Sequence, residues 1–198
     1  GSEWKIVKYR LGIKKYPACY CTHRALDAML ELLGRHPLKP KEIERIFVSL
    51  SDTHSLILRN HRPQTGLEAK FSIEFAIAAA VIARRAGLAE YSDAFVQRSD
   101  VQELMRRVFV ETNQNYDPDV SGASVWDLVR VELTAGGIIE SEKVSRAKGH
   151  ADRPLSESEL FEKFRGCLDA GRAKIAPDVL FERLKHLESL SARELTAI

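Results

Sequence analysis

Apolar residues recur at helical spacing in two long stretches of the chain. Between Tyr20 and Gly34 they stand three or four positions apart, and glycine is a residue that commonly follows the last helical turn. The alanine-rich stretch 67–86 has the same spacing and is followed by Gly87. The pattern predicts one continuous helix in each stretch.

Other segments alternate apolar and polar residues, which is typical of strands covered on one face. Residues 42–50 predict such a strand, and the short segment 108–111 is also expected to form a strand. Residues 124–133 and 138–144 are separated by the glycine-containing turn 134–137, which predicts a β-hairpin.

The rest of the chain is expected to contain one long loop and several shorter helices. Segment 51–66 has no sustained period and is expected to form a long basic loop, and loops of that length are often functional. Strands and helices mix without a βαβ rhythm, so we expect an α+β fold: a small, mainly antiparallel sheet packed with helices, followed by C-terminal helices. The shorter helices are predicted at 92–95, 100–105, 155–168, 177–187 and 191–197.

Composition limits the function classes. The 198 residues are 44% hydrophobic, which is enough for a sizeable core, and 30 Lys+Arg against 28 Asp+Glu leave a net charge of +2. This balance argues for neither nucleic acid nor a membrane surface as a partner. Three cysteines do not form a disulfide framework, and no signal-peptide pattern is visible, so we expect a cytoplasmic protein.

The stretch from Gly12 to His23 concentrates the candidate chemistry. Pro17 holds the preceding residue, Tyr16, in an extended conformation, and a helix follows, so Lys14 is expected on a strand-like arm beside a helix start. A lysine near the positive end of a helix suits a carboxylate or phosphate. The alternative is an ordinary solvated lysine.

Cys19, Cys21 and His23 allow three interpretations. They are zinc-type ligands, but their spacing leaves the ligand set incomplete, so no metal site is expected. Cys19 and His23 could form a thiol–imidazole nucleophile one helical turn apart. The remaining interpretation is that these side chains pack in the core.

Several short motifs occur in a fixed order along the chain: Ile13–Cys19, Thr22-His23, Asp27-Ala28, Glu68–Ser72, Gly149-His150, Arg153–Ser156, Leu160 and Lys163-Phe164. Together they resemble the second domain of the MmgE/PrpD family, which includes 2-methylcitrate dehydratase, cis-aconitate decarboxylase and iminodisuccinate epimerase. The resemblance implies an enzyme that acts on small di- and tricarboxylic acids without a metal or organic cofactor.

The resemblance implies a domain organisation. Residues 3–154 would be the α+β lid-type domain, and residues 155–198 a helical segment that packs on a missing N-terminal helical domain. Gly1-Ser2 resembles a tag remnant. The family's general acid and base lie in the helical domain, so the fragment is expected to be inactive alone, and the parent enzyme to be a homodimer.

The resemblance also assigns residues. Lys14 matches the active-site lysine, which would hold a substrate carboxylate and stabilise a carbanion or enolate. Two departures, Cys19 where the decarboxylase branch has a histidine and Ser55 where it has a tyrosine, favour a dehydratase, another lyase or an epimerase over a decarboxylase. The alternative is a non-catalytic domain that binds a small anion or a protein. Substrate-binding roles are expected for Tyr16, Cys19, His23, His54 and Lys70.

Overall fold

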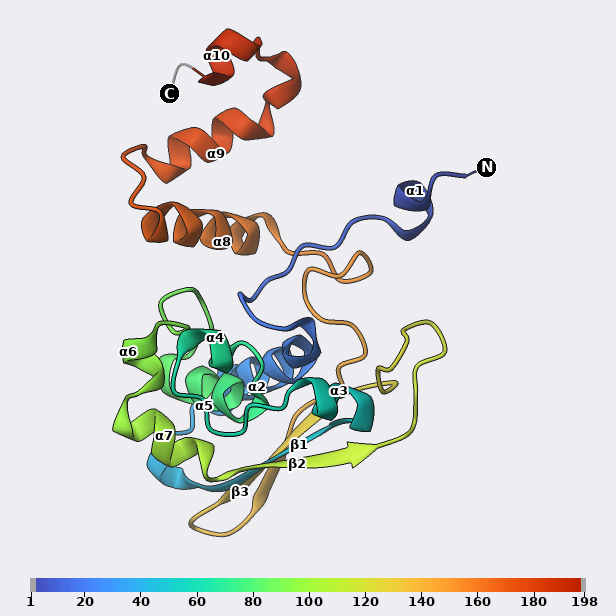
Figure 1. Ribbon diagram of the computed structural model, residues 1–198, viewed down its shortest axis with the longest axis vertical. Helices are drawn as coiled ribbons and strands as arrows, with labels where there is room; N and C mark the ends of the chain where they lie inside the picture. Colours follow the sequence, from blue (N-terminus) through green and yellow to red (C-terminus); the bar gives the residue numbers. More distant parts are fainter. Residues whose placement is uncertain (1–2, 197–198) are drawn as a thin grey trace. The chain divides into compact units, whose positions relative to one another are not determined.

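The computed structural model describes residues 3–196. By its internal contacts the chain divides into residues 1–154, called unit 1, and residues 155–198, called unit 2. Unit 1 holds a four-stranded sheet whose one side is covered by helices (Figure 1). The α+β class predicted from the sequence is therefore confirmed.

The strands of unit 1 are ordered β2-β1-β3-β4 across the sheet. The β1–β3 and β3–β4 pairs are antiparallel, as expected of a mainly antiparallel sheet and its hairpin. The β1–β2 pair is parallel, because the chain between these strands crosses over the sheet through several helices. The strands are β1 (Ile43–Ser51), β2 (Val108–Asn113), β3 (Leu128–Leu133) and β4 (Ile138–Glu140).

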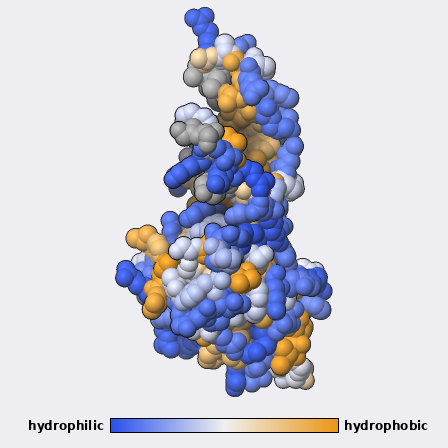
Figure 2. Space-filling model, turned by 90° about the vertical axis from the view of Figure 1, so that its right-hand side faces the viewer, coloured by the Kyte–Doolittle hydropathy of each residue, from blue (hydrophilic) through white to orange (hydrophobic). Residues whose placement is uncertain are grey.

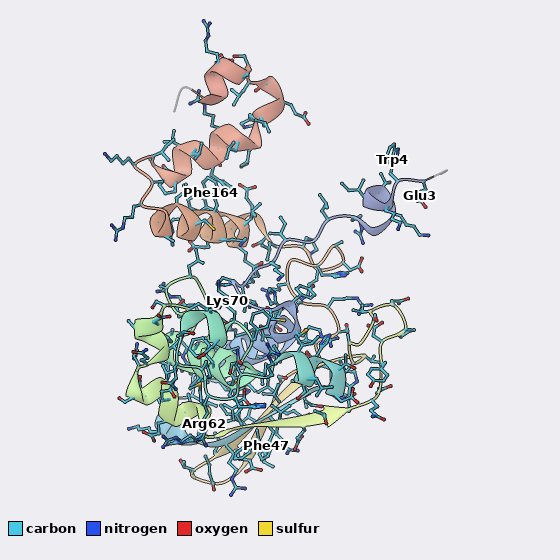
Figure 3. The ribbon with its side chains drawn as sticks, in the orientation of Figure 1. Glu3, Trp4, Phe47, Arg62, Lys70 and Phe164 are labelled. Carbon is cyan, nitrogen blue, oxygen red and sulfur yellow. The ribbon has the colours of Figure 1, made fainter. Side chains whose placement is uncertain are left out.

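The core of unit 1 lies between the sheet and two long helices. On β1, Ile46, Val48 and Leu50 are fully buried and point to the helical side, as their spacing by two requires. Phe47 points to the opposite side (Figure 3), where its ring stacks on Phe109 at 5.5 Å. The helices of unit 1 are α1 (Lys5–Tyr9), η1 (Tyr20–Thr22), α2 (His23–Arg35), η2 (Pro40–Glu42), α3 (Asp52–Ile57), α4 (Gly66–Ala69), α5 (Ile73–Ala83), α6 (Asp93–Val96) and α7 (Ser99–Met105).

Two predictions about these helices were wrong. The single helix expected over 67–86 is divided into α4 and α5, because the Ser72 hydroxyl accepts the Phe75 N–H and starts a new helix. The loop expected over 51–66 contains α3, which begins where the Ser51 hydroxyl accepts the His54 N–H. Such a short helix carries too few periodic positions to be detected from spacing alone.

Unit 2 is helical, with α8 (Glu157–Ala170), α9 (Pro177–Lys185), η3 (Leu187–Ser189) and α10 (Ala192–Thr196). Ser156 and Glu159 form the capping box that starts α8, and Pro177 is the first residue of α9. The Phe181 ring lies 5.1 Å from that of Phe161 and 5.4 Å from that of Phe164. The end of the last predicted helix, at residue 197, lies outside the described residues.

The molecular surface in Figure 2 is mainly hydrophilic on the side shown, with hydrophobic residues in separate patches. Within residues 3–196 no helix combines the length and the apolar character that crossing a membrane requires.

Candidate functional site

Lys14 is an exposed residue of the segment 13–16, called the arm, which is held by hydrogen bonds on both sides of Lys14. Before it, the Ile13 N–H donates to the Gly149 carbonyl at 2.7 Å. After it, the buried Tyr16 hydroxyl donates to the Asp27 carboxylate at 2.6 Å. The Lys14 ammonium is exposed and reaches the Ala18 carbonyl at 3.4 Å. The strand-like arm expected from the sequence is not a strand, because residues 11–14 have no regular secondary structure and residues 15–18 form bends. The Lys14 side chain is nevertheless accessible to a small anion.

Cys19 is the half-buried residue that directly precedes η1 and α2. A hydrogen bond from the Cys21 side chain lowers the pKa of Cys19 to about 6, burial opposes this shift, and the Lys14 charge supports it. The same pairing, together with burial, raises the pKa of Cys21. This environment favours the thiolate form of Cys19, and the Lys14 charge contributes to that preference.

Lys70 lies in the turn between α4 and α5 (Figure 3). Its carbonyl accepts the Cys19 N–H at 2.9 Å, so the helix break that sequence analysis missed joins this turn to the start of η1. The Lys70 side chain is half-buried. Two of the predicted residues, Cys19 and Lys70, are thus neighbours through their backbones.

His23 and Tyr16 are buried inside unit 1 rather than open to solvent. His23 has no exposed surface, and its ring lies 5.1 Å from that of Tyr16 and 4.9 Å from that of Tyr20. Tyr16 is 4% exposed, and its hydroxyl is used by Asp27. Both side chains support the arm from within. Their spacing along the chain gave no indication of which side of the arm they occupy.

His54 lies on α3 and is half-buried. Burial lowers the pKa of His54, and the Arg24 charge lowers it further. Its imidazole is therefore neutral at neutral pH. It can donate one hydrogen bond and accept another, but it does not offer a positive charge to a carboxylate.

A buried ion pair lies behind this region and was missed by sequence reasoning. The Arg24 guanidinium is bound to the Asp127 carboxylate at 2.7 and 3.1 Å. Its remaining N–H groups donate to the hydroxyl and carbonyl of Ser124 and to the Ser145 carbonyl. Every N–H group of the Arg24 guanidinium thus has a hydrogen-bond partner inside unit 1. No local signal could have revealed this pairing, because the partners are about a hundred positions apart in the sequence.

Among residues 3–196, no three His, Cys, Asp or Glu side chains are grouped so that they could hold a metal ion. Cys19, Cys21 and His23 do not form such a group, because His23 is enclosed by the two tyrosine rings.

Fold and site together define the class: an α+β domain that presents a lysine on a fixed arm beside a thiol of low pKa. The family model described as the MmgE/PrpD C-terminal domain matches residues 16–177. The chain therefore belongs to the MmgE/PrpD family, and the resemblance recognised in its sequence is confirmed.

Curated relatives of the chain are cis-aconitate decarboxylases. The Aspergillus terreus protein is 25% identical over 206 residues, which cover 96% of this chain and 41% of that protein. The Mus musculus and Homo sapiens proteins are 24% and 23% identical, each covering 95% of this chain and 39% of their own length. The chain thus spans about two fifths of the length of these relatives.

Proposed function

We propose that this chain is the C-terminal part of an enzyme that abstracts a proton from a small di- or tricarboxylic acid without a cofactor. The observation that carries the proposal is the accessible Lys14 ammonium on an arm fixed by Ile13 and Tyr16, in a chain of the MmgE/PrpD family. The reaction is a dehydration, another lyase reaction or an epimerisation. The active enzyme is proposed to be a cytoplasmic homodimer.

The role proposed for Lys14 follows from where charge develops. When the bond between the α-carbon and its proton breaks, the electron pair moves toward the neighbouring carboxylate and forms an enolate-like anion. An ammonium placed at that carboxylate stabilises this anion more than the substrate. The intermediate then expels hydroxide in a dehydration, or takes a proton on the opposite face in an epimerisation.

The group that accepts the proton is proposed to lie outside this chain. His54 is neutral but half-buried, and His23 has no exposed surface. We therefore propose that an N-terminal helical domain supplies the acid and base, that unit 1 is the lid over its site, and that unit 2 packs on that domain. The 198-residue chain alone is then inactive.

The relatives' names raise decarboxylation as a specific alternative. Cys19 stands where, by the resemblance described above, the decarboxylase branch has a histidine, and a thiol whose pKa is lowered to about 6 does not replace an imidazole as acid or base. This difference favours dehydration or epimerisation for this protein. The other alternative is a non-catalytic domain that binds a small anion or a protein.

The test measures turnover of 2-methylcitrate, cis-aconitate and iminodisuccinate by the enzyme that contains this chain. We expect Lys14→Ala to lower kcat by about a hundredfold or more, since it removes a charge that acts on the transition state. Lys41→Ala, which removes an exposed lysine of η2, is the matched control and keeps wild-type turnover. Unchanged turnover in Lys14→Ala contradicts the role of Lys14, and anion binding without any turnover favours the non-catalytic alternative.

A further inference from the structure

Asp27 is a buried carboxylate on α2 that gathers donors from two distant segments. It is 1% exposed. One oxygen accepts the Tyr16 hydroxyl at 2.6 Å, and the other accepts the Lys148 N–H at 2.6 Å. Arg153 also lies 3.4 Å from the second oxygen. Asp27 therefore joins the N-terminal arm to the segment 148–153.

The arm and the segment 148–153 are also in contact on the N-terminal side of Lys14. The residue before it, Ile13, donates its N–H to the carbonyl of Gly149, which directly follows Lys148. The backbone on either side of the exposed Lys14 is therefore attached, at Tyr16 on one side and at Ile13 on the other. The first attachment ends on Asp27 itself, and the second ends one residue from the backbone group that Asp27 holds.

The packing between the arm and segment 148–153 leaves little freedom. A Cβ atom on Gly12 would lie 3.2 Å from the Gly149 carbonyl oxygen, so the two backbones are close to contact. Gly149 has a φ of +87°, and its N–H donates to the Arg153 carbonyl at 2.8 Å, which closes the turn. A displacement of this turn would therefore move the arm that carries Lys14.

We infer that Asp27 is a positioning residue that sets the place of Lys14 through Tyr16 and the Lys148–Gly149 backbone. The inference rests on the proposed function, because it assigns a purpose to the position of Lys14. Asp27 does not act on the substrate, since it is buried on the inner side of the arm. A lysine has a flexible stem, so the backbone that bears it must be fixed, and small misplacements of catalytic groups reduce rates strongly.

The test uses variants that remove single bonds. Tyr16→Phe deletes the hydroxyl that binds Asp27 and leaves the Lys148 contact in place. The matched control is Tyr91→Phe: Tyr91 is also buried, at 6% exposed, and its hydroxyl has no hydrogen-bond partner within residues 3–196. Asp27→Asn is the stronger variant, because its amide nitrogen cannot accept an N–H as the second carboxylate oxygen does.

The first measurement does not depend on activity. Amide hydrogen exchange at Ile13 is followed in the 198-residue chain, where this N–H is bonded to Gly149. We expect Tyr16→Phe and Asp27→Asn to accelerate this exchange by about tenfold or more, because the arm opens more often once it is released at Tyr16. Tyr91→Phe should leave it unchanged. An exchange rate in Tyr16→Phe equal to that of the wild type overturns the inference, whatever the activity.

The second measurement compares kcat and KM in the enzyme that contains the chain. We expect Tyr16→Phe to lower kcat by about tenfold with little change in KM, and Tyr91→Phe to have wild-type values. Faster exchange at Ile13 with unchanged kcat would make Asp27 a purely structural residue and overturn the positioning role. If the wild-type enzyme turns over none of the three acids, the proposed function fails, and the exchange measurement still decides whether Asp27 holds the arm.

Discussion

Lys14 and Arg24 are cations close to the same helix start, but the fold uses them differently. All the N–H groups of Arg24 are bound within unit 1, and the residue is 6% exposed. Lys14 is exposed, and its ammonium contacts a backbone carbonyl at 3.4 Å. A carboxylate arriving from solvent can therefore reach Lys14 and cannot reach Arg24.

Replacing Arg24 should destabilise the fold strongly. In Arg24→Met the Asp127 carboxylate remains buried without its partner, so we expect a loss of about 3 to 5 kcal/mol in the free energy of unfolding. Arg35→Met on the same helix removes an exposed pair with Glu142 and should cost less than about 1 kcal/mol. Urea denaturation measures both, and equal losses would contradict the structural role of Arg24.

Cys19 should react with iodoacetamide at unusually low pH. Since the thiolate is the reactive form and the pKa of Cys19 is about 6, the alkylation rate should rise through that pH. Cys21→Ala removes the hydrogen bond and Lys14→Met the positive charge, so each should move the rise to higher pH. Mass spectrometry assigns the modified residue, and Cys19→Ala is the control that abolishes the reaction at low pH.

The Cys19→Ala variant also shows whether the reactive thiol takes part in catalysis. If Cys19→Ala retains turnover in the enzyme that contains the chain, Cys19 is not a nucleophile, despite its thiolate. An alkylation rate of Cys19 that rises only near the ordinary cysteine pKa of about 8.5 would contradict the lowered pKa of this thiol.

At the scale of elements, periodic patterns predicted which segments are helical or extended, but not where each helix begins. The helix over residues 20–34, the strand over 42–50 and the hairpin around residues 134–137 are confirmed. The break between α4 and α5 was missed, because apolar residues continue through it at helical spacing. Only the side-chain caps decide that a new helix begins at Ile73.

Two glycines of unit 1 helices should respond oppositely to alanine. At Gly66, the first residue of α4, a Cβ atom would lie 2.0 Å from the Tyr91 carbonyl oxygen, so Gly66→Ala should cost about 3 kcal/mol. At Gly34 in α2 nothing lies within 4 Å of that position, so Gly34→Ala should add about 0.5 kcal/mol through helix propensity. Thermal denaturation distinguishes them, and a neutral Gly66→Ala would contradict the close approach.

At the scale of the whole molecule, the two units differ in how much apolar surface each buries. Unit 1 contains the continuous core between α2, α5 and the sheet. In unit 2, Leu180 and Phe181 are the buried apolar side chains among the residues whose burial is described, each 9% exposed. Unit 2 therefore has less internal stabilisation than unit 1.

Hydrogen exchange of the 198-residue chain should reflect this difference. Amides of α8 and α9 should exchange at least about tenfold faster than those of β1 and α5, because local opening costs less where few apolar contacts are lost. Amides in α8 can be compared directly with those of α2, a helix of similar length. Equal protection in the two helices would contradict a separately weak unit 2.

The sequence by itself determined the α+β class, the main periodic elements and the family. These properties depend on neighbouring residues, whose spacing and caps are visible along the chain. Only the tertiary structure decided that β1 and β2 run parallel, that His23 is enclosed and that Arg24 is paired with Asp127. Those outcomes depend on contacts between residues far apart in the sequence, and burial is a property of the packed domain rather than of any local pattern.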